Sequence, residues 1–417
     1  MKKPILLLLT GTALLLLYTN CSDTAFVVSN KAFGVTSLGS TTTTGSTPFP
    51  TATPVVSTGS VNNVLAVTVG CGYVNEPCVT VTICVPGTST CQTIPNVLLD
   101  TGSYGLRLFS SVVTIPLVQE TDPANSSHSV AECVAYADGS GQWGPVKKAD
   151  IVLSGEKASA IPIQIVDSTY PGVPSNCTNL DSSPSATGFN GILGVGLFVQ
   201  DCGPGCESVA NNGIYYSCAG ATCSGMTISV ASQVANPVAF FAADNNGVIL
   251  ELPAISDAGA LTLNGSLVFG IGTQSDNSPS AAAARFAADG YGNFKTTFSG
   301  TSYSGFIDSG SNGLYFPSSS ITACTGSYQG FYCPASTMSF SAIQMSSSST
   351  NPNTVSFEVA NGQNELQTSN PNMVFNNLAG AMASDFDWGL PFFFGRNIFV
   401  GIEGKSSAVG TGPYWAY

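Results

Sequence analysis

The chain has 417 residues, enough for two lobes of ordinary domain size. Hydrophobic residues make up 43% of it and charged residues only 8%, which excludes a disordered chain and favours an all-β protein with many turns. The formal net charge of −13 argues against nucleic acid or an anionic membrane surface as a partner.

Residues 1–21 have the pattern of a secretory signal peptide. The apolar run from Ile5 to Leu17 is 13 residues long, shorter than the roughly 20 residues of a membrane span. It ends just before Cys21 and resembles the lipobox of bacterial lipoproteins, whose cysteine carries the lipid anchor. We therefore expect a lipid on Cys21 and attachment to the outer membrane. The three residues before Cys21 depart from the usual lipobox, so simple cleavage and secretion remain the alternative.

Beyond the signal peptide, the composition changes twice. Residues 22–60 are rich in Thr, Ser, Pro and Gly, which predicts a flexible tether. From residue 61 onward, short stretches of β-branched residues alternate with Gly, Pro, Asn and Asp, which predicts the strands of a sandwich or barrel. Residues 224–235 are a candidate for a short helix.

The cysteine count indicates disulfides. Twelve of the 13 cysteines follow Cys21, and an even set in an exported chain predicts six disulfides. Spacing suggests that Cys84 pairs with Cys91 and Cys324 with Cys333, each within a hairpin. The cysteines at 202, 206, 218 and 223 allow more than one pairing. No CxxC occurs and histidine is absent nearby, so we expect no metal site.

The chain contains one histidine, His128. A Ser-His-Asp or Cys-His arrangement would depend on this residue alone. It lies in the polar stretch NSSHSVAEC, which we interpret as a solvated loop.

Two stretches repeat the same pattern: LLDTGSYGLRL at 98–108 and FIDSGSNGLYF at 306–316. A buried apolar pair before each aspartate would anchor a strand, and the glycines would let each turn approach its twin closely. Two later stretches, 188–198 and 389–399, each place two large apolar residues before a glycine. The arrangement predicts two duplicated lobes.

In this order the motifs resemble those of the pepsin-like aspartic peptidases. The stretch 135–144 is similar to that family's flap hairpin, 189–196 to its apolar-apolar-Gly segment, and 265–276 to the strand that links its lobes. The chain also resembles an uncharacterised group of bacterial envelope proteins with the same Asp turns. The resemblance implies a bilobal, all-β double barrel with an N-terminal lobe at 61–255, a C-terminal lobe at 256–417 and a cleft between them.

The resemblance also implies a catalytic pair formed by Asp100 and Asp308. Two carboxyl groups side by side cannot both ionise, so they would share a proton and activate a water molecule. Around this pair, we expect support from loop residues and a covering flap. The supporting residues are Thr101, Gly102, Ser103, Ser309, Gly310 and Ser311, and the flap residues are Tyr136, Asp138 and Gly139.

The sequence thus predicts a monomeric aspartic endopeptidase of the bacterial envelope that acts on peptides or proteins and needs no cofactor. One departure from the family is Arg107, which stands where a Trp usually supports the flap tyrosine. Trp143 is the candidate replacement. The alternatives are a catalytically silent protein of the same fold that binds peptide or glycan, and a structural envelope lipoprotein.

Overall fold

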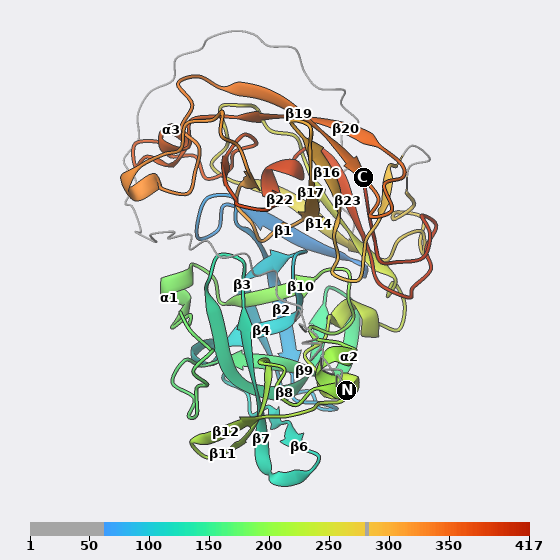
Figure 1. Cartoon of the computed structure of the whole chain (residues 1–417). Helices are drawn as coiled ribbons and strands as arrows, with labels where there is room; N and C mark the ends of the chain where they lie inside the picture. The colour runs from blue at the N-terminus through green and yellow to red at the C-terminus, as the bar shows by residue number, and fades with distance from the viewer. Residues whose placement is uncertain (1–61, 280–282) are drawn as a thin grey trace, which may run out of the picture.

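The computed structural model describes residues 62–279 and 283–417. The expected signal peptide, the lipidation site at Cys21 and the tether at 22–60 lie outside these residues. The chain forms two β-rich lobes, one above the other in Figure 1, as expected for the bilobal all-β architecture. Within the described residues, no helix has the length and hydropathy that a membrane crossing requires.

Two sheets, one of 17 strands and one of seven, make up this architecture. The 17-stranded sheet contains β1 (Val64–Val69), β2 (Pro77–Cys84), β3 (Cys91–Asp100), β4 (Tyr104–Phe109), β5 (Val118–Gln119), β6 (Thr121–Asp122), β7 (Asn125–Ala135), β8 (Gly141–Leu153), β9 (Glu156–Val166), β10 (Gly191–Val195), β11 (Tyr215–Ala219), β12 (Thr222–Gly225), β13 (Gly247–Leu252), β14 (Leu263–Phe269), β15 (Arg285–Ala287), β23 (Arg396–Gly401) and β24 (Tyr414–Ala416). The seven-stranded sheet contains β16 (Phe294–Phe298), β17 (Thr301–Ile307), β18 (Leu314–Phe316), β19 (Met338–Met345), β20 (Asn353–Val359), β21 (Ala379–Ala381) and β22 (Asp385–Trp388).

Helices are short and few in the described residues. They are α1 (Pro184–Thr187), α2 (Pro204–Ser208), α3 (Gly362–Leu366) and the 3₁₀ turns η1 (Ser110–Val112), η2 (Val230–Ser232), η3 (Pro237–Phe240), η4 (Gly326–Tyr328) and η5 (Leu390–Phe392). The helix expected at 224–235 was wrong, since only η2 forms there. The backbone of Val234 is bonded to Tyr215 Oη and to the Asp201 N–H instead, so tertiary contacts replace the helical hydrogen bonds.

The same four-strand arrangement occurs once in each half of the chain. In the first half, β10 lies between β3, to which it is parallel, and β4, to which it is antiparallel, and β9 runs parallel to β4. In the second half, β22 lies in the same way between β17 and β18, and β21 runs parallel to β18. Asp100 is the last residue of β3 and Asp308 comes directly after β17, so the duplication places the two Asp turns in equivalent positions.

The register of these strands corrects one part of the predicted repeat. Ile192 pairs with Leu98, and Asp387 pairs with Phe306. The counterpart of the Ile-Leu-Gly segment at 192–194 is therefore Asp-Trp-Gly at 387–389, and the three residues 393–395 lie beyond η5. The sequence comparison chose the wrong segment because Phe393 and Phe394 resemble the apolar pair Ile192 and Leu193 better than Asp387 and Trp388 do.

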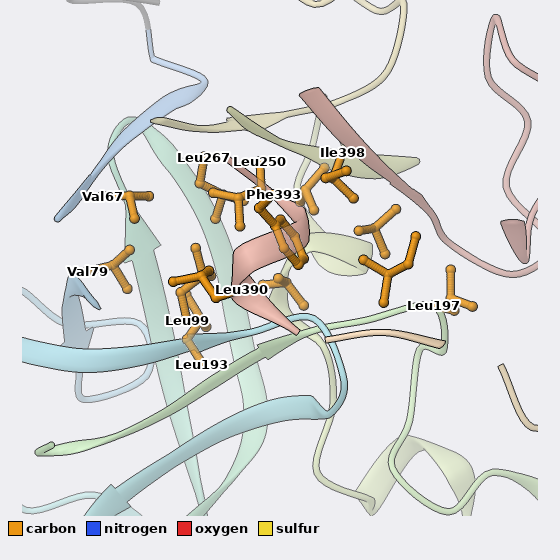
Figure 2. Packing of buried hydrophobic residues seen from close by; sticks show 14 of the residues in the cluster. Val67, Val79, Leu99, Leu193, Leu197, Leu250, Leu267, Leu390, Phe393 and Ile398 are labelled. Carbon is orange, nitrogen blue, oxygen red and sulfur yellow. The ribbon is translucent and has the colours of Figure 1, made fainter. Parts of the chain in front are cut away.

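A continuous apolar core joins the two halves (Figure 2). Leu99 of β3 and Leu193 of β10 lie in the same buried cluster as Leu390 and Phe393 from the segment after β22. Strand β1 adds to the connection, because it pairs along its whole length with β14. The core thus stabilises the floor on which both Asp turns rest.

All twelve cysteines after Cys21 are paired, as predicted. The disulfides are Cys71–Cys78, Cys84–Cys91, Cys133–Cys177, Cys202–Cys206, Cys218–Cys223 and Cys324–Cys333. Five of the six close loops of fewer than ten residues. This density of disulfides indicates an exported protein.

The interpretation of His128 as a solvated loop residue was wrong. His128 lies in β7, and its Nδ1 is 3.0 Å from Ser217 Oγ. Ser217 Oγ donates to Asp122 Oδ2 at 2.6 Å, so the hydroxyl proton points at the carboxylate and not at the imidazole. The histidine therefore does not act as the base of a serine nucleophile here.

Gly389 offers a test of the corrected repeat. A Cβ at this position would lie 2.0 Å from the Gly313 carbonyl oxygen, just as one at Gly194 would lie 2.5 Å from Tyr104 N. We expect Gly389→Ala to destabilise the protein by about 1–3 kcal/mol, because the added methyl group meets backbone that cannot move aside easily. Denaturant unfolding measures this. Gly290→Ala is the matched control, since a Cβ there meets nothing within 4 Å, and an equal loss in both variants would contradict the assignment.

Candidate active site

The two Asp turns meet at the floor of the cleft. Asp100 ends β3 and Asp308 follows β17. Each carboxyl group lies against the glycine of the opposite loop. A Cβ on Gly102 would be 2.6 Å from Asp308 Cγ, and a Cβ on Gly310 would be 2.8 Å from Asp100 Oδ1. Only glycine permits this approach, so the repeated Asp-Thr/Ser-Gly pattern brings two carboxyl groups together.

Four hydrogen bonds between the lobes hold the two turns in place. Thr101 Oγ1 donates to the Ile307 carbonyl at 2.9 Å and accepts from Ser309 N at 2.9 Å. In the mirror arrangement, Ser309 Oγ donates to the Leu99 carbonyl at 2.7 Å and accepts from Thr101 N at 3.0 Å. Thr101 and Ser309 are buried. Each hydroxyl therefore uses its donor and an acceptor position across the interface.

The same loops also orient the carboxyl groups. Gly102 N donates to Asp100 Oδ1 at 2.7 Å, and Ser103 Oγ donates to Asp100 Oδ2. Around Asp308 the equivalent donors are Gly310 N, at 2.8 Å from Oδ1, and Ser311 Oγ, at 2.9 Å from Oδ2. Each carboxyl group thus has one backbone and one hydroxyl donor.

The carboxyl groups of Asp100 and Asp308 are buried next to each other, so a negative charge on both would be unfavourable. Burial, then the neighbouring Asp100 and Asp387 carboxylates, raise the pKa of Asp308 well above its usual value. Asp100 is only 6% exposed. The arrangement therefore favours one proton shared between the two carboxyl groups.

A hairpin covers this floor, formed by β7, β8 and the turn between them. Gly139 takes a positive φ of 84° at the turn, and Asp138 Oδ1 accepts from Ser140 N at 2.9 Å. Tyr136 lines the cleft beside the aspartates, and burial raises its pKa. Its hydroxyl donates to Gln142 Oε1 at 3.0 Å.

Gln142, and not Trp143, supports the flap tyrosine. Gln142 is fully buried, and its Nε2 donates to Asp181 Oδ2 at 2.9 Å. Trp143 points to the other face of β8, where it donates to the Tyr170 carbonyl and packs against Tyr216. Successive side chains of a strand point to opposite faces, so only one of Gln142 and Trp143 can face the flap tyrosine. The sequence alone could not tell which, because the register of β8 was unknown.

Arg107 belongs to a buried ion network behind the flap. Its NH2 group donates to Glu132 Oε1 at 2.7 Å and to Asp201 Oδ2 at 2.8 Å, and Tyr215 Oη donates to Asp201 Oδ1 at 2.7 Å. Burial and the Glu132 carboxylate raise the pKa of Asp201 well above its usual value. The guanidinium is thus balanced by carboxyl groups and adds no free positive charge to the cleft.

The cleft itself has a volume of about 720 Å³. Both lobes line it, with apolar walls from Leu98, Phe189, Ile192 and Phe306 around the carboxyl pair. Among residues 62–279 and 283–417, no group of three or more His, Cys, Asp or Glu residues is arranged to hold a metal ion. Sequence reasoning missed three carboxyl groups that line the cleft, Asp181, Asp201 and Asp387, because strand register between distant segments was unknown.

The ion network gives a stability prediction. We expect Arg107→Met to cost about 3–5 kcal/mol near neutral pH, because it leaves two buried carboxyl groups without their cation. The loss should shrink in acid, where these carboxyls can take up protons. Chemical unfolding at several pH values measures it. The control is Lys148→Met, which breaks the partly exposed pair with Glu120 and should cost at most about 1 kcal/mol; equal losses would show that Arg107 is not held in a buried network.

Comparisons with known proteins bear on both fold and family. Among solved structures, the chain is similar to the crystal structure of the aspartic proteinase from Irpex lacteus. The TM-score is 0.51 and the sequence identity 15%, over 85% of this chain and 96% of that one. At this identity, the similarity establishes the pepsin-like fold alone. A search of curated proteins found no match. A family model described as "Protein of unknown function (DUF3443)" matches residues 59–417, and the chain therefore belongs to this family.

Proposed function

We propose that this protein is an aspartic endopeptidase of the bacterial cell envelope. The observation that carries the proposal is the pair of carboxyl groups, Asp100 and Asp308, linked across the lobes by Thr101 and Ser309 at the floor of a covered cleft. Two carboxyls with one shared proton provide a base and an acid at the same place. No bound cofactor is required, and one chain supplies both halves of the site, so we propose that a monomer acts.

The reaction follows from this arrangement. Asp100, as carboxylate, accepts a proton from a water molecule while the water oxygen bonds to the carbonyl carbon of the peptide. The π electrons move to the carbonyl oxygen, which takes the proton of Asp308. The neutral diol then returns a hydroxyl proton to Asp308 and re-forms the carbonyl. The C–N bond breaks, and the amine nitrogen takes the proton from Asp100.

The cleft is suited to an extended peptide. A strand in a long groove can use its backbone hydrogen bonds, whereas its side chains enter the walls on alternate sides. Because Leu98, Phe189 and Phe306 line the cleft, we propose that large apolar side chains flank the cleaved bond. Tyr136 would lie over the substrate and exclude water once it is bound.

The second candidate is a silent protein of the same fold that binds peptide without cleaving it. Arg107 favours this alternative, since it stands at the position of the tryptophan that usually supports the flap. Against it, Gln142 and Asp181 supply another support for Tyr136, and both aspartates keep their full sets of donors. A structural envelope lipoprotein would require none of these features.

The catalytic test uses Asp100→Asn and Asp308→Asn. Purified residues 61–417 should cleave a denatured protein in acid, with a bell-shaped pH profile, because one carboxyl must be charged and the other protonated. Each variant should lose at least about 1000-fold in turnover, since neither can share the proton. Circular dichroism should show that both remain folded.

A variant with an exposed aspartate outside the cleft, Asp257→Asn, is the control and should keep full activity. Near-normal cleavage by Asp308→Asn would contradict the two-carboxyl mechanism. A wild type that binds peptide at every pH between about 3 and 8 but cleaves none would establish the silent binding protein in its place.

The place of action gives a separate prediction. We propose that Cys21 becomes the lipidated N-terminus and that the protein is attached to the outer membrane by this lipid alone. Mass spectrometry of the mature protein from membranes should detect an acylated cysteine as first residue, and Cys21→Ser should release the protein from the membrane fraction. An unmodified N-terminus downstream of Cys21 would show plain secretion.

A further inference from the structure

A third aspartate, Asp387, lies at the cleft beside the carboxyl pair. It is the third of the four residues of β22, where it pairs with Phe306 on one side and with Tyr315 on the other. Its neighbours Phe386 and Trp388 face the opposite way and stack on each other with ring centroids 4.4 Å apart. Because side chains alternate along a strand, Asp387 faces the cleft, which it lines.

In the other half of the chain, this position is apolar. Ile192, the counterpart of Asp387, pairs with Leu98 and Arg107 in β10 and also lines the cleft. A second difference lies beside it, since Arg107 of β4 corresponds to Tyr315 of β18, but Arg107 is paired with Glu132 and Asp201. Asp387 therefore adds a carboxyl group near Asp308 that has no counterpart near Asp100.

The carboxyl group of Asp387 lacks the donors that a buried charge needs. The residue is 2% exposed, and its Oδ1 has no hydrogen-bond partner among the described residues. The Ser311 hydroxyl is a hydrogen-bond partner that lowers the pKa of Asp387, and the same Oγ donates to Asp308 Oδ2 at 2.9 Å. A serine hydroxyl has a single proton, so Ser311 can stabilise a negative charge on only one of the two carboxyls at a time.

The groups around Asp387 offer no compensating positive charge. Asp308 and Asp100 face it from the two Asp turns, Asp385 lies on its own strand, and the Tyr315 phenol is on the neighbouring strand. None of the ion pairs in the described part of the chain includes any of these residues. A second and third negative charge in this cluster would each be unfavourable, so the cluster retains protons.

We propose that Asp387 is a positioning residue that acts through Ser311 to keep the shared proton on Asp308, and so makes Asp308 the acid and Asp100 the base. The assignment of acid and base rests on the proposed peptidase function, whereas the coupling of Asp387 to Asp308 does not. Burial and the charge of Asp100 raise the pKa of Asp387 well above its usual value, and the charge of Asp387 in turn raises the pKa of Asp308. Each effect favours the protonated form of the carboxyl group on which it acts.

The first test is the pH profile of cleavage by Asp387→Asn and Asp387→Ile. Asparagine has nearly the same shape without the charge, and isoleucine reproduces the residue of the other half. In both variants, the alkaline limb of kcat/KM should move about one pH unit or more towards acid, because Asp308 loses the neighbouring charge that helps it hold its proton. Asp257→Asn removes an exposed carboxylate outside the cleft and should leave the profile in place. An unchanged profile in the Asp387 variants would overturn the proposal.

The second test requires no turnover. A carboxyl whose pKa is raised on folding stabilises the protein most below its unfolded pKa of about 4, and this stabilisation is lost as pH rises through the folded value. Asp387→Asn should therefore raise the Tm near neutral pH and have little effect near pH 4. In an Asp308→Asn background the gain should be smaller, because one of the repelling charges is gone.

An equal gain in both backgrounds would show that the two groups are independent and would overturn the proposal. The two tests also separate it from the proposed function. If the wild type cleaves nothing, the peptidase proposal fails, and the thermal double-mutant cycle still decides whether Asp387 and Asp308 are coupled.

Discussion

The contact between two like-charged groups is the constraint on which the rest of the structure depends. Two unit charges 4 Å apart repel by about 4 kcal/mol at an effective dielectric constant of 20. The four hydrogen bonds of Thr101 and Ser309 contribute about 1 kcal/mol each, so they would be nearly cancelled by two full charges. A shared proton removes most of this repulsion. The pair is stable because it is not fully ionised, and the same state is the one that can act as base and acid.

Much of this arrangement could be predicted from the sequence, because it depends on local patterns that occur twice. The apolar pair, aspartate and glycine define each turn within a few residues, and the Asp138–Gly139 hairpin is equally local. The disulfides that could be assigned, such as Cys84–Cys91, close short loops. Short range alone was not always decisive, because Cys202–Cys206 and Cys218–Cys223 also close short loops, yet the spacing of these four cysteines left their pairing open.

The residues that sequence reasoning missed depend on strand register between distant segments. Arg107 is neutralised by Glu132 and Asp201, 25 and 94 residues away, and no local pattern indicates such partners. Asp387 was missed for a related reason. The apolar pair at 393–394 imitates the expected motif better than the true counterpart does, and only the pairing of β22 with β17 distinguishes them.

Duplication alone does not decide which of the two aspartates holds the proton, and Arg107 and Asp387 are where the two halves differ. Two identical half-sites would give two aspartates with equal affinity for the proton, and either could then serve as acid or as base. A fixed assignment of the two roles requires that the half-sites differ. Here the two halves differ at β10 and β22: Ile192 of β10 pairs with Arg107, and Asp387 of β22 pairs with Tyr315. The balanced Arg107 network adds no negative charge beside Asp100, whereas Asp387 adds a carboxyl beside Asp308. Departures from the repeat can therefore carry as much of the chemistry as the repeat itself.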